Sequence, residues 1–315
     1  MTRDWTPLGT PTALRATPLV GALMAARALV WLPGPILFFT RLPRIRQLPS
    51  GNAWTHVSLS LRSGNAAISA LLALLAIGVG IALVAGVKRA RPAAPIVLWA
   101  MLVSEALVIV GLVIPDLLLL PRLMGYWLPT LASLGLTARE AIADIGWAAV
   151  LIVFLRRLRA DPDADTLFYP LRGQAVPSMV AVVALLVAFR EGLGIVSAPF
   201  ALNSLIGSFA GGSWLSPVAL ASAASVAAPV LAIVCAITLP LMPRITRTLT
   251  ACALAGAILR AVAQLAIVTP SSAMSGLTVA SVYFVPAATV LEYAAMAWAL
   301  TLVRAPVGEE ASDES

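Results

Sequence analysis

Charged side chains interrupt several long apolar stretches of the sequence, at positions where a lipid environment would disfavour them. Three bases and three acids fall near the middle of such stretches: Arg27, Glu105, Arg190, Glu191, Arg260 and Glu292. A polar amide, Gln264, follows Arg260 by one helical turn. A charge at the centre of a transmembrane helix costs about 2.5–3.5 kcal/mol on insertion scales and almost always faces a bundle interior or an aqueous cavity. These seven residues are therefore predicted to form a polar site near the middle of a membrane.

The polar set has two interpretations that the sequence leaves open. In the first, the charges line a site or pathway between two halves of a transporter. In the second, they only pair with one another and fix the register of the helices, because three acids can neutralise three bases. Arg260 and Gln264 lie four residues apart on one helical face, so both could contact one acid, and Glu105 is the proposed partner.

Other chemistries have little support in the sequence. His56 is the only histidine, which argues against haem ligation by paired histidines and against His-rich zinc sites. No G-x-x-x-x-G-K-[ST] phosphate loop occurs. Cys235 and Cys252 have no metal-ligand spacing and are interpreted as small core residues. No catalytic residue, metal site or cofactor is predicted, and enzymatic activity is not favoured.

Two acidic clusters are interpreted as structural. Glu140 and Asp144 are placed in the first turn of a predicted helix, where acids complement the helix dipole. The run from Asp161 to Asp165 resembles the start of a calcium loop, but it lacks the turn glycine and has Arg172 where the last ligand should stand. It is interpreted as a solvated loop.

The overall composition requires a membrane. Hydrophobic residues make up 60% of the 315-residue chain and charged residues 11%, and the mean hydropathy is +0.96. Soluble domains are about 45–50% apolar and about 25% charged. The apolar runs are long and unbroken, which favours helices over a barrel. The predicted fold class is an all-α, polytopic integral membrane bundle. The net charge of +7 is assigned to anionic lipid headgroups rather than to nucleic acid.

The apolar runs predict eight transmembrane helices. Their approximate bounds are 18–40, 66–87, 95–115, 138–156, 176–198, 216–241, 249–269 and 281–303. Pro33 and Pro35 interrupt the first, which is expected to be broken or re-entrant. The segment 116–136 contains two prolines and the Tyr126–Trp127 pair, and it is interpreted as an interfacial helix, with a ninth span as the alternative.

The distribution of basic residues predicts the topology. Clusters follow the second, fourth, sixth and eighth spans, whereas the loops 199–215 and 270–280 have none. Because cytoplasmic loops are rich in Lys and Arg, both termini are expected in the cytoplasm, with the protein in a plasma (inner) membrane. The loop 41–65 contradicts this pattern, since it would be external and yet has four arginines.

Similar local patterns recur in the two halves of the chain. Leu23–Arg27 resembles Leu186–Arg190, and Glu105 with Pro115 corresponds to Arg260 with Pro270. Glu140 with Trp147 likewise corresponds to Glu292 with Trp298. A parallel 4+4 internal duplication would explain these matches. The expected organisation is a cytoplasmic N-terminus (1–17), a first half (18–160), a linker (161–175), a second half (176–304) and a disordered acidic tail (305–315).

The sequence is compatible with three functions. The leading one is a transporter or permease with its polar site between the halves. The second is a non-catalytic scaffold or anchor subunit of a larger complex, and the third is a membrane-embedded enzyme that modifies lipid. The expected partners are the lipid bilayer and, for a scaffold, other proteins within the membrane. A water-accessible cavity at the charged residues would favour transport, and sealed ion pairs would favour a scaffold.

Overall fold

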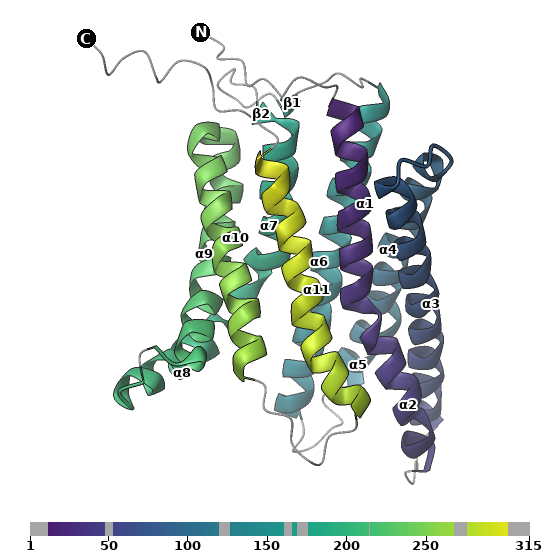
Figure 1. Ribbon diagram of the computed structural model, residues 1–315. Helices are drawn as coiled ribbons and strands as arrows, with labels where there is room; N and C mark the ends of the chain where they lie inside the picture. The colour runs from purple at the N-terminus through teal and green to yellow at the C-terminus, as the bar shows by residue number, and fades with distance from the viewer. Residues whose placement is uncertain are drawn as a thin grey trace, which may run out of the picture.

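The structure of the protein, a computed structural model, is a bundle of long helices (Figure 1). It describes residues 12–47, 53–119, 127–160, 166–168, 176–213, 215–267 and 276–301. Within these ranges the only strands are two short ones that pair with each other. The predicted fold class, a polytopic helical membrane bundle, is confirmed.

The first half of the chain is helical throughout its described part. Its elements are α1 (Thr12–Trp31), α2 (Pro33–Gln47), α3 (Ala53–Val84), α4 (Ala90–Val108), a π-helical segment (Ile109–Val113), α5 (Ile114–Leu119) and α6 (Trp127–Ala160). The chain therefore crosses the bundle along α1 and α2, returns along α3, and repeats this with α4 and α6 (Figure 1).

The second half opens with strand β1 (Thr166–Phe168), which pairs antiparallel with β2 (Val176–Pro177). The elements that follow are α7 (Ser178–Glu191), a 3-10 segment (Gly192–Ser197), α8 (Ala198–Ala210), α9 (Pro217–Leu241), α10 (Pro243–Ile267) and α11 (Gly276–Thr301). The run Asp161–Asp165, interpreted above as a solvated loop, and the acidic tail 305–315 lie outside the described residues.

Seven helical stretches of the described chain are long and apolar enough to cross a membrane. They correspond to seven of the eight predicted spans. The remaining predicted span, 138–156, falls in α6, a 34-residue helix that lies among the others but has charged residues in both of its halves. The count of about eight crossing helices therefore agrees with the sequence.

The segment 116–136, interpreted as an interfacial helix, is described only at its two ends. Residues 116–119 belong to α5 and residues 127–136 to α6, and 120–126 lie outside the described residues. Pro129 does not end the helix because it lies in the first turn of α6, where backbone N–H groups have no intrahelical acceptor. Glu140 and Asp144 therefore lie deep within α6 and not in its first turn, so the explanation by the helix dipole is wrong.

The first span is broken, as predicted. α1 ends at Trp31, and α2 continues from Pro33 toward the same end of the bundle (Figure 1). The predicted loop 41–65 is largely helical, because α2 extends to Gln47 and α3 begins at Ala53. This corrects the predicted loop but not the charge pattern, because Arg41, Arg44 and Arg46 lie on α2, at the end of the bundle opposite the α3–α4 connection (Figure 1). The predicted N-terminal segment 1–17 also overlaps α1, which begins at Thr12.

The elements at the two ends of the described chain lie at the same end of the bundle. The start of α1 and the end of α11 lie beside the β1–β2 pair, at the top of Figure 1. The α3–α4 and α9–α10 connections lie at this end too, whereas α2, α5 and α8 lie at the other. This arrangement is what an even number of crossings produces.

Helices α1 and α3 make a backbone contact through glycine. A Cβ atom on Gly80 would lie 2.5 Å from the carbonyl oxygen of Gly21, and a Cβ on Gly21 would lie 2.5 Å from that of Gly80. Small residues allow membrane helices to approach closely and gain dispersion contacts. Elsewhere, α1 also packs along α11, and α6 along α7. The first helix of each half therefore contacts the last helix of the other half, although the internal duplication itself stays a prediction.

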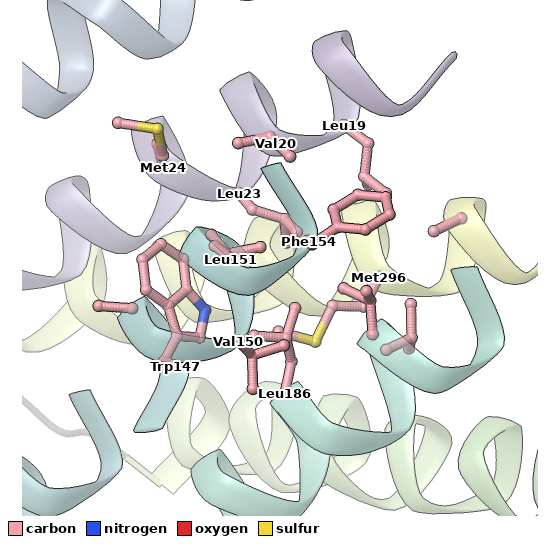
Figure 2. Close-up of a cluster of buried hydrophobic side chains, with 14 of the residues drawn as sticks. Leu19, Val20, Leu23, Met24, Trp147, Val150, Leu151, Phe154, Leu186 and Met296 are labelled. Carbon is pink, nitrogen blue, oxygen red and sulfur yellow. The ribbon is translucent and has the colours of Figure 1, made fainter. Parts of the chain in front are cut away.

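A buried apolar cluster lies where α1, α6, α7 and α11 meet (Figure 2). The side chains drawn there include Leu19, Val20, Leu23, Met24, Trp147, Val150, Leu151, Phe154, Leu186 and Met296. All are buried. The surface of the bundle, by contrast, exposes many large apolar side chains, such as Ile96, Val110 and Leu291. An apolar exterior of this kind is compatible with lipid as the surrounding solvent.

Candidate functional site

A buried ion pair joins α1 to α6. Arg27 is 2% exposed and donates a hydrogen bond from Nε to Oδ1 of Asp144 at 2.8 Å, while its Nη2 pairs with the same oxygen. The indole of Trp31, one turn further along α1, donates to Oδ2 of Asp144 at 3.0 Å. Both oxygens of this carboxylate therefore have donors, which offsets much of the cost of burying it.

The carboxylate of Glu292 on α11 lies between two guanidinium groups. Its Oε2 is 3.6 Å from Nη1 of Arg27 and 3.8 Å from Nε of Arg190 on α7. Glu292 is fully buried, and neither of its oxygens accepts a hydrogen bond from the residues described. Arg27 Nη1 and Arg190 Nε are also buried without a hydrogen bond in the described part of the chain. Glu292 is thus attracted by the guanidinium groups of both Arg27 and Arg190 and forms no hydrogen bond with either of them.

A second, tighter cluster joins α7, α10 and α11. Arg260 donates a hydrogen bond from Nη2 to Oε1 of Glu191 at 2.7 Å, and the hydroxyl of Tyr293 donates to the same oxygen. Nη1 of Arg260 lies 2.7 Å from Oε2 of Glu191 as an ion-pair contact, but Oε2 accepts no hydrogen bond from the described residues. Glu191 is 1% exposed and Tyr293 fully buried. A charge-assisted contact of this kind is stronger than a hydrogen bond between neutral groups.

Neighbouring residues connect the two clusters. Arg190 and Glu191 are consecutive at the end of α7, and Glu292 and Tyr293 are consecutive on α11. One member of each pair belongs to the loose cluster around Glu292 and the other to the tight cluster around Arg260. A movement of α7 or α11 would therefore change both clusters together.

A cavity of about 600 Å³ lies beside the loose cluster. It is partly open and is lined by α1, α2, α3, α4, α6, α7 and α11. Its charged lining residues are Arg27, Arg62, Glu105, Glu140, Asp144 and Arg190. Its apolar wall includes Val30, Phe38, Val108, Leu112 and Val285. This combination of apolar walls with a few charged groups is typical of sites for small molecules.

Two cavity residues of opposite charge have no hydrogen-bonding partner among the residues described. Glu105 makes no hydrogen bond or ion pair with any residue that the structure describes, although Arg27, Glu140 and Asp144 are close enough to influence it. Arg190 keeps 16% of its side chain exposed despite its depth and donates no hydrogen bond to the described residues. Both side chains therefore keep hydrogen-bonding atoms available to the contents of the cavity.

The apolar cluster and the cavity lie on opposite sides of the charged residues. Moving one turn along each central helix in one direction leads from Arg27, Asp144, Arg190 and Glu292 to the apolar Leu23, Trp147, Leu186 and Met296 (Figure 2). Moving the other way along α1, α6 and α11 leads to the cavity residues Trp31, Ala141 and Val285. The bundle is therefore layered. The buried apolar cluster, called the apolar plug below, is followed by the charged residues and then by the cavity.

The helix that holds Glu105 changes its hydrogen-bonding pattern directly after it. The backbone N–H of Ile109 approaches the carbonyls of both Glu105 and Ala106, and the segment Ile109–Val113 is π-helical. Two cavity residues, Val108 and Leu112, flank or belong to this segment. Single-turn π segments within helices frequently occur at functional sites, since they re-aim side chains at a local energetic cost.

The structure brings together most of the polar set that the sequence singled out. Arg27, Arg190 and Glu292 form the loose cluster, Glu191 and Arg260 form the tight one, and Glu105 lines the cavity. The proposed Glu105–Arg260 pair is wrong, because Glu191 occupies the guanidinium of Arg260. Gln264 is exposed and belongs to neither cluster.

Several members of the site were not predicted. Asp144, which the sequence places at a helix terminus, belongs to the loose cluster, and Tyr293 and Trp31 lie outside the predicted polar set. The position of Tyr293 next to Glu292 was the available signal, because a phenol beside a buried acid on a membrane helix needs a polar partner. Within the described residues, no group of histidines, cysteines and acids is arranged to hold a metal ion.

An Asp144→Asn variant should be destabilised by about 3–5 kcal/mol, the usual cost of removing one partner from a buried ion pair. Arg27 would keep only Glu292, at 3.6 Å. Unfolding in mixed micelles, followed by circular dichroism, measures the change. The control is Glu140→Gln, the same chemical change one turn away on an exposed side chain, which should cost at most about 0.5 kcal/mol. Equal losses in the two variants would show that the buried pair has no special weight.

The chain matches no known family, no curated protein and no solved structure. The fold and the site together define a class, a multi-pass helical membrane protein with a charged cavity inside the bundle.

Proposed function

We propose that this protein is a transporter or permease for a small polar solute that binds in the charged cavity. The observation that carries the proposal is the cavity itself, a space of about 600 Å³ that reaches Glu105 and Arg190 at the middle of the bundle. Sealed ion pairs alone would suit a scaffold and would leave no such space. Intramembrane charges that face a cavity are typical of substrate and ion pathways.

The layering of the bundle supports alternating access. In the present arrangement the cavity lies on one side of the charged layer, and the apolar plug lies on the other. Release on the far side requires the plug between α1, α6, α7 and α11 to part. Glu292 favours such a change, because it lies at nearly equal distances from Arg27 on α1 and Arg190 on α7 and could follow either helix.

The orientation in the membrane belongs to the same proposal. Two groups of basic residues lie at the end of the bundle that holds the apolar plug (Figure 1). They are Lys88, Arg89 and Arg91, at the α3–α4 connection, and the arginines at the end of α6. Although α2 has three arginines at the opposite end, the positive-inside rule favours this end as the cytoplasmic one, and we assign the protein to a plasma (inner) membrane. The cavity would then face the outside.

The test measures the flux of many candidate solutes at once. Proteoliposomes are loaded with a mixture of amino acids, carboxylates, amines and sugars, and the contents are followed by mass spectrometry. At least one solute should leave faster than from protein-free vesicles, and Arg190→Gln should slow it about 10-fold or more, as expected for loss of a charged contact. The control, Arg159→Gln, changes an exposed arginine in the last turn of α6, outside the cavity. Identical leakage from wild-type and protein-free vesicles would contradict transport.

A further inference from the structure

Two opposite charges line the cavity without pairing with each other or with a hydrogen-bonding partner among the described residues. They are Glu105 on α4 and Arg190 on α7, which approach from different helices. No ion pair joins them among the residues described. Of the other charged residues that line the cavity, Arg27 and Asp144 pair with each other, and Asp144 also accepts a hydrogen bond from Trp31.

We infer that the cavity binds a small zwitterion, whose anionic group contacts Arg190 and whose cationic group contacts Glu105. The inference rests on the proposed function and names the chemical class of its solute. An anion alone would leave Glu105 desolvated and without a partner, and a cation alone would leave Arg190 with only its 3.8 Å ion pair to Glu292 and no hydrogen bond from the described residues, each at a cost in free energy. A zwitterion satisfies both and adds no net charge to the bundle.

The surroundings of each charge fit this orientation. Arg190 approaches Glu292 through Nε at 3.8 Å, and its terminal nitrogens donate no hydrogen bond to the described residues, so they can form a two-pronged contact with a carboxylate. Two other acids, Asp144 and Glu140, line the same cavity and act on Glu105, and Glu140 adds to its attraction for a cation. Arg27 opposes that attraction, but its guanidinium is already paired with Asp144.

The walls between the two charges suggest the body of the ligand. Val30, Val108, Leu112 and Val285 line the same cavity and offer apolar contacts. An aliphatic amino acid matches these walls and charges, because it has two charged groups and an apolar chain. Leucine and γ-aminobutyrate are therefore the probes, and they differ in the distance between their charges.

The experiment measures equilibrium binding by calorimetry to the full-length protein in lipid nanodiscs. Each zwitterion is compared with the analogue that lacks its amine and with the analogue that lacks its carboxylate. For leucine these are isocaproate and isoamylamine, and for γ-aminobutyrate they are butyrate and propylamine. At least one zwitterion should bind about 10- to 100-fold more tightly than both of its analogues, as loss of a charged hydrogen bond predicts.

Two substitutions assign each end of the ligand. In Glu105→Gln the zwitterion should bind no better than its carboxylate analogue, and in Arg190→Gln no better than its amine analogue. Gln264→Ala, on the exposed face of α10, is the control and should leave every affinity unchanged. A thermal unfolding measurement without ligand confirms that the variants are folded.

Each outcome decides the inference. If carboxylates bind as well as zwitterions, Glu105 has no role in recognition, and if amines bind as well, Arg190 has none. If neither zwitterion binds, the solute class is wrong. Flux of a sugar or a singly charged solute in the vesicle experiment would keep the proposed function and overturn only the zwitterion. Binding of a zwitterion without flux of any solute would support the zwitterion site and overturn the proposed transport.

Discussion

Arg260→Gln should lower the free energy of unfolding by about 3–5 kcal/mol, because the substitution leaves Glu191 charged and buried without its partner. Glu191 is 1% exposed, and in the native protein both of its oxygens lie 2.7 Å from the arginine. Tyr293 alone would then hold the carboxylate. Titration with a denaturing detergent, followed by circular dichroism, measures the loss.

The double variant Glu191→Gln/Arg260→Gln separates the pair from its individual charges. It removes both charges together and should recover a large part of the lost stability, since no uncompensated ion remains. Gln264→Ala, one turn along α10 and exposed, should change stability by at most about 0.5 kcal/mol. Recovery through Glu105→Gln in place of Glu191→Gln would refute the pairing seen in the structure.

Gly80→Ala should destabilise the protein by about 1–3 kcal/mol, although alanine is the better helix former. The added methyl group would lie 2.5 Å from the carbonyl oxygen of Gly21 and 2.9 Å from the backbone nitrogen of Ala25. Neither backbone atom can move unless α1 and α3 separate, and separation loses contacts along both helices.

Gly78→Ala is a matched control in the same helix. A Cβ atom on Gly78 meets nothing within 4 Å, so this change should be neutral or should stabilise α3 by up to about 1 kcal/mol. In the detergent titration, Gly80→Ala should therefore lower stability, and Gly78→Ala should not. Equal effects would show that the close approach of α1 and α3 contributes nothing to stability.

Much of the fold could be predicted from the sequence because lipid imposes simple rules. Apolar runs of sufficient length must be helices, and the described spans follow the predicted ones closely. The break after Trp31 was predictable because proline at positions 33 and 35 removes backbone donors. The early start of α6 was not, because Pro129 has the same appearance in the sequence whether it ends a helix or lies in the first turn of one.

The sequence predicts most of the charged residues of the candidate site, but it does not predict which acid pairs with which base. A charge within an apolar run must be compensated, so Arg27, Arg190 and Glu292 could be selected before the fold was established. Which acid meets which base depends on how the helices pack. Glu191 meets Arg260 across 69 positions in the chain, and Asp144 meets Arg27 across 117, distances at which sequence spacing carries no information.

The contacts of Arg27 impose an order on biosynthesis. This arginine enters the membrane with the first helix, but its partners Asp144 and Glu292 are on α6 and α11, which the ribosome makes later. Until α11 is inserted, the nascent chain therefore holds guanidinium groups without a complete set of counter-charges. The charge of the first helix is therefore fully compensated only after the helix that holds Glu292 has packed against it.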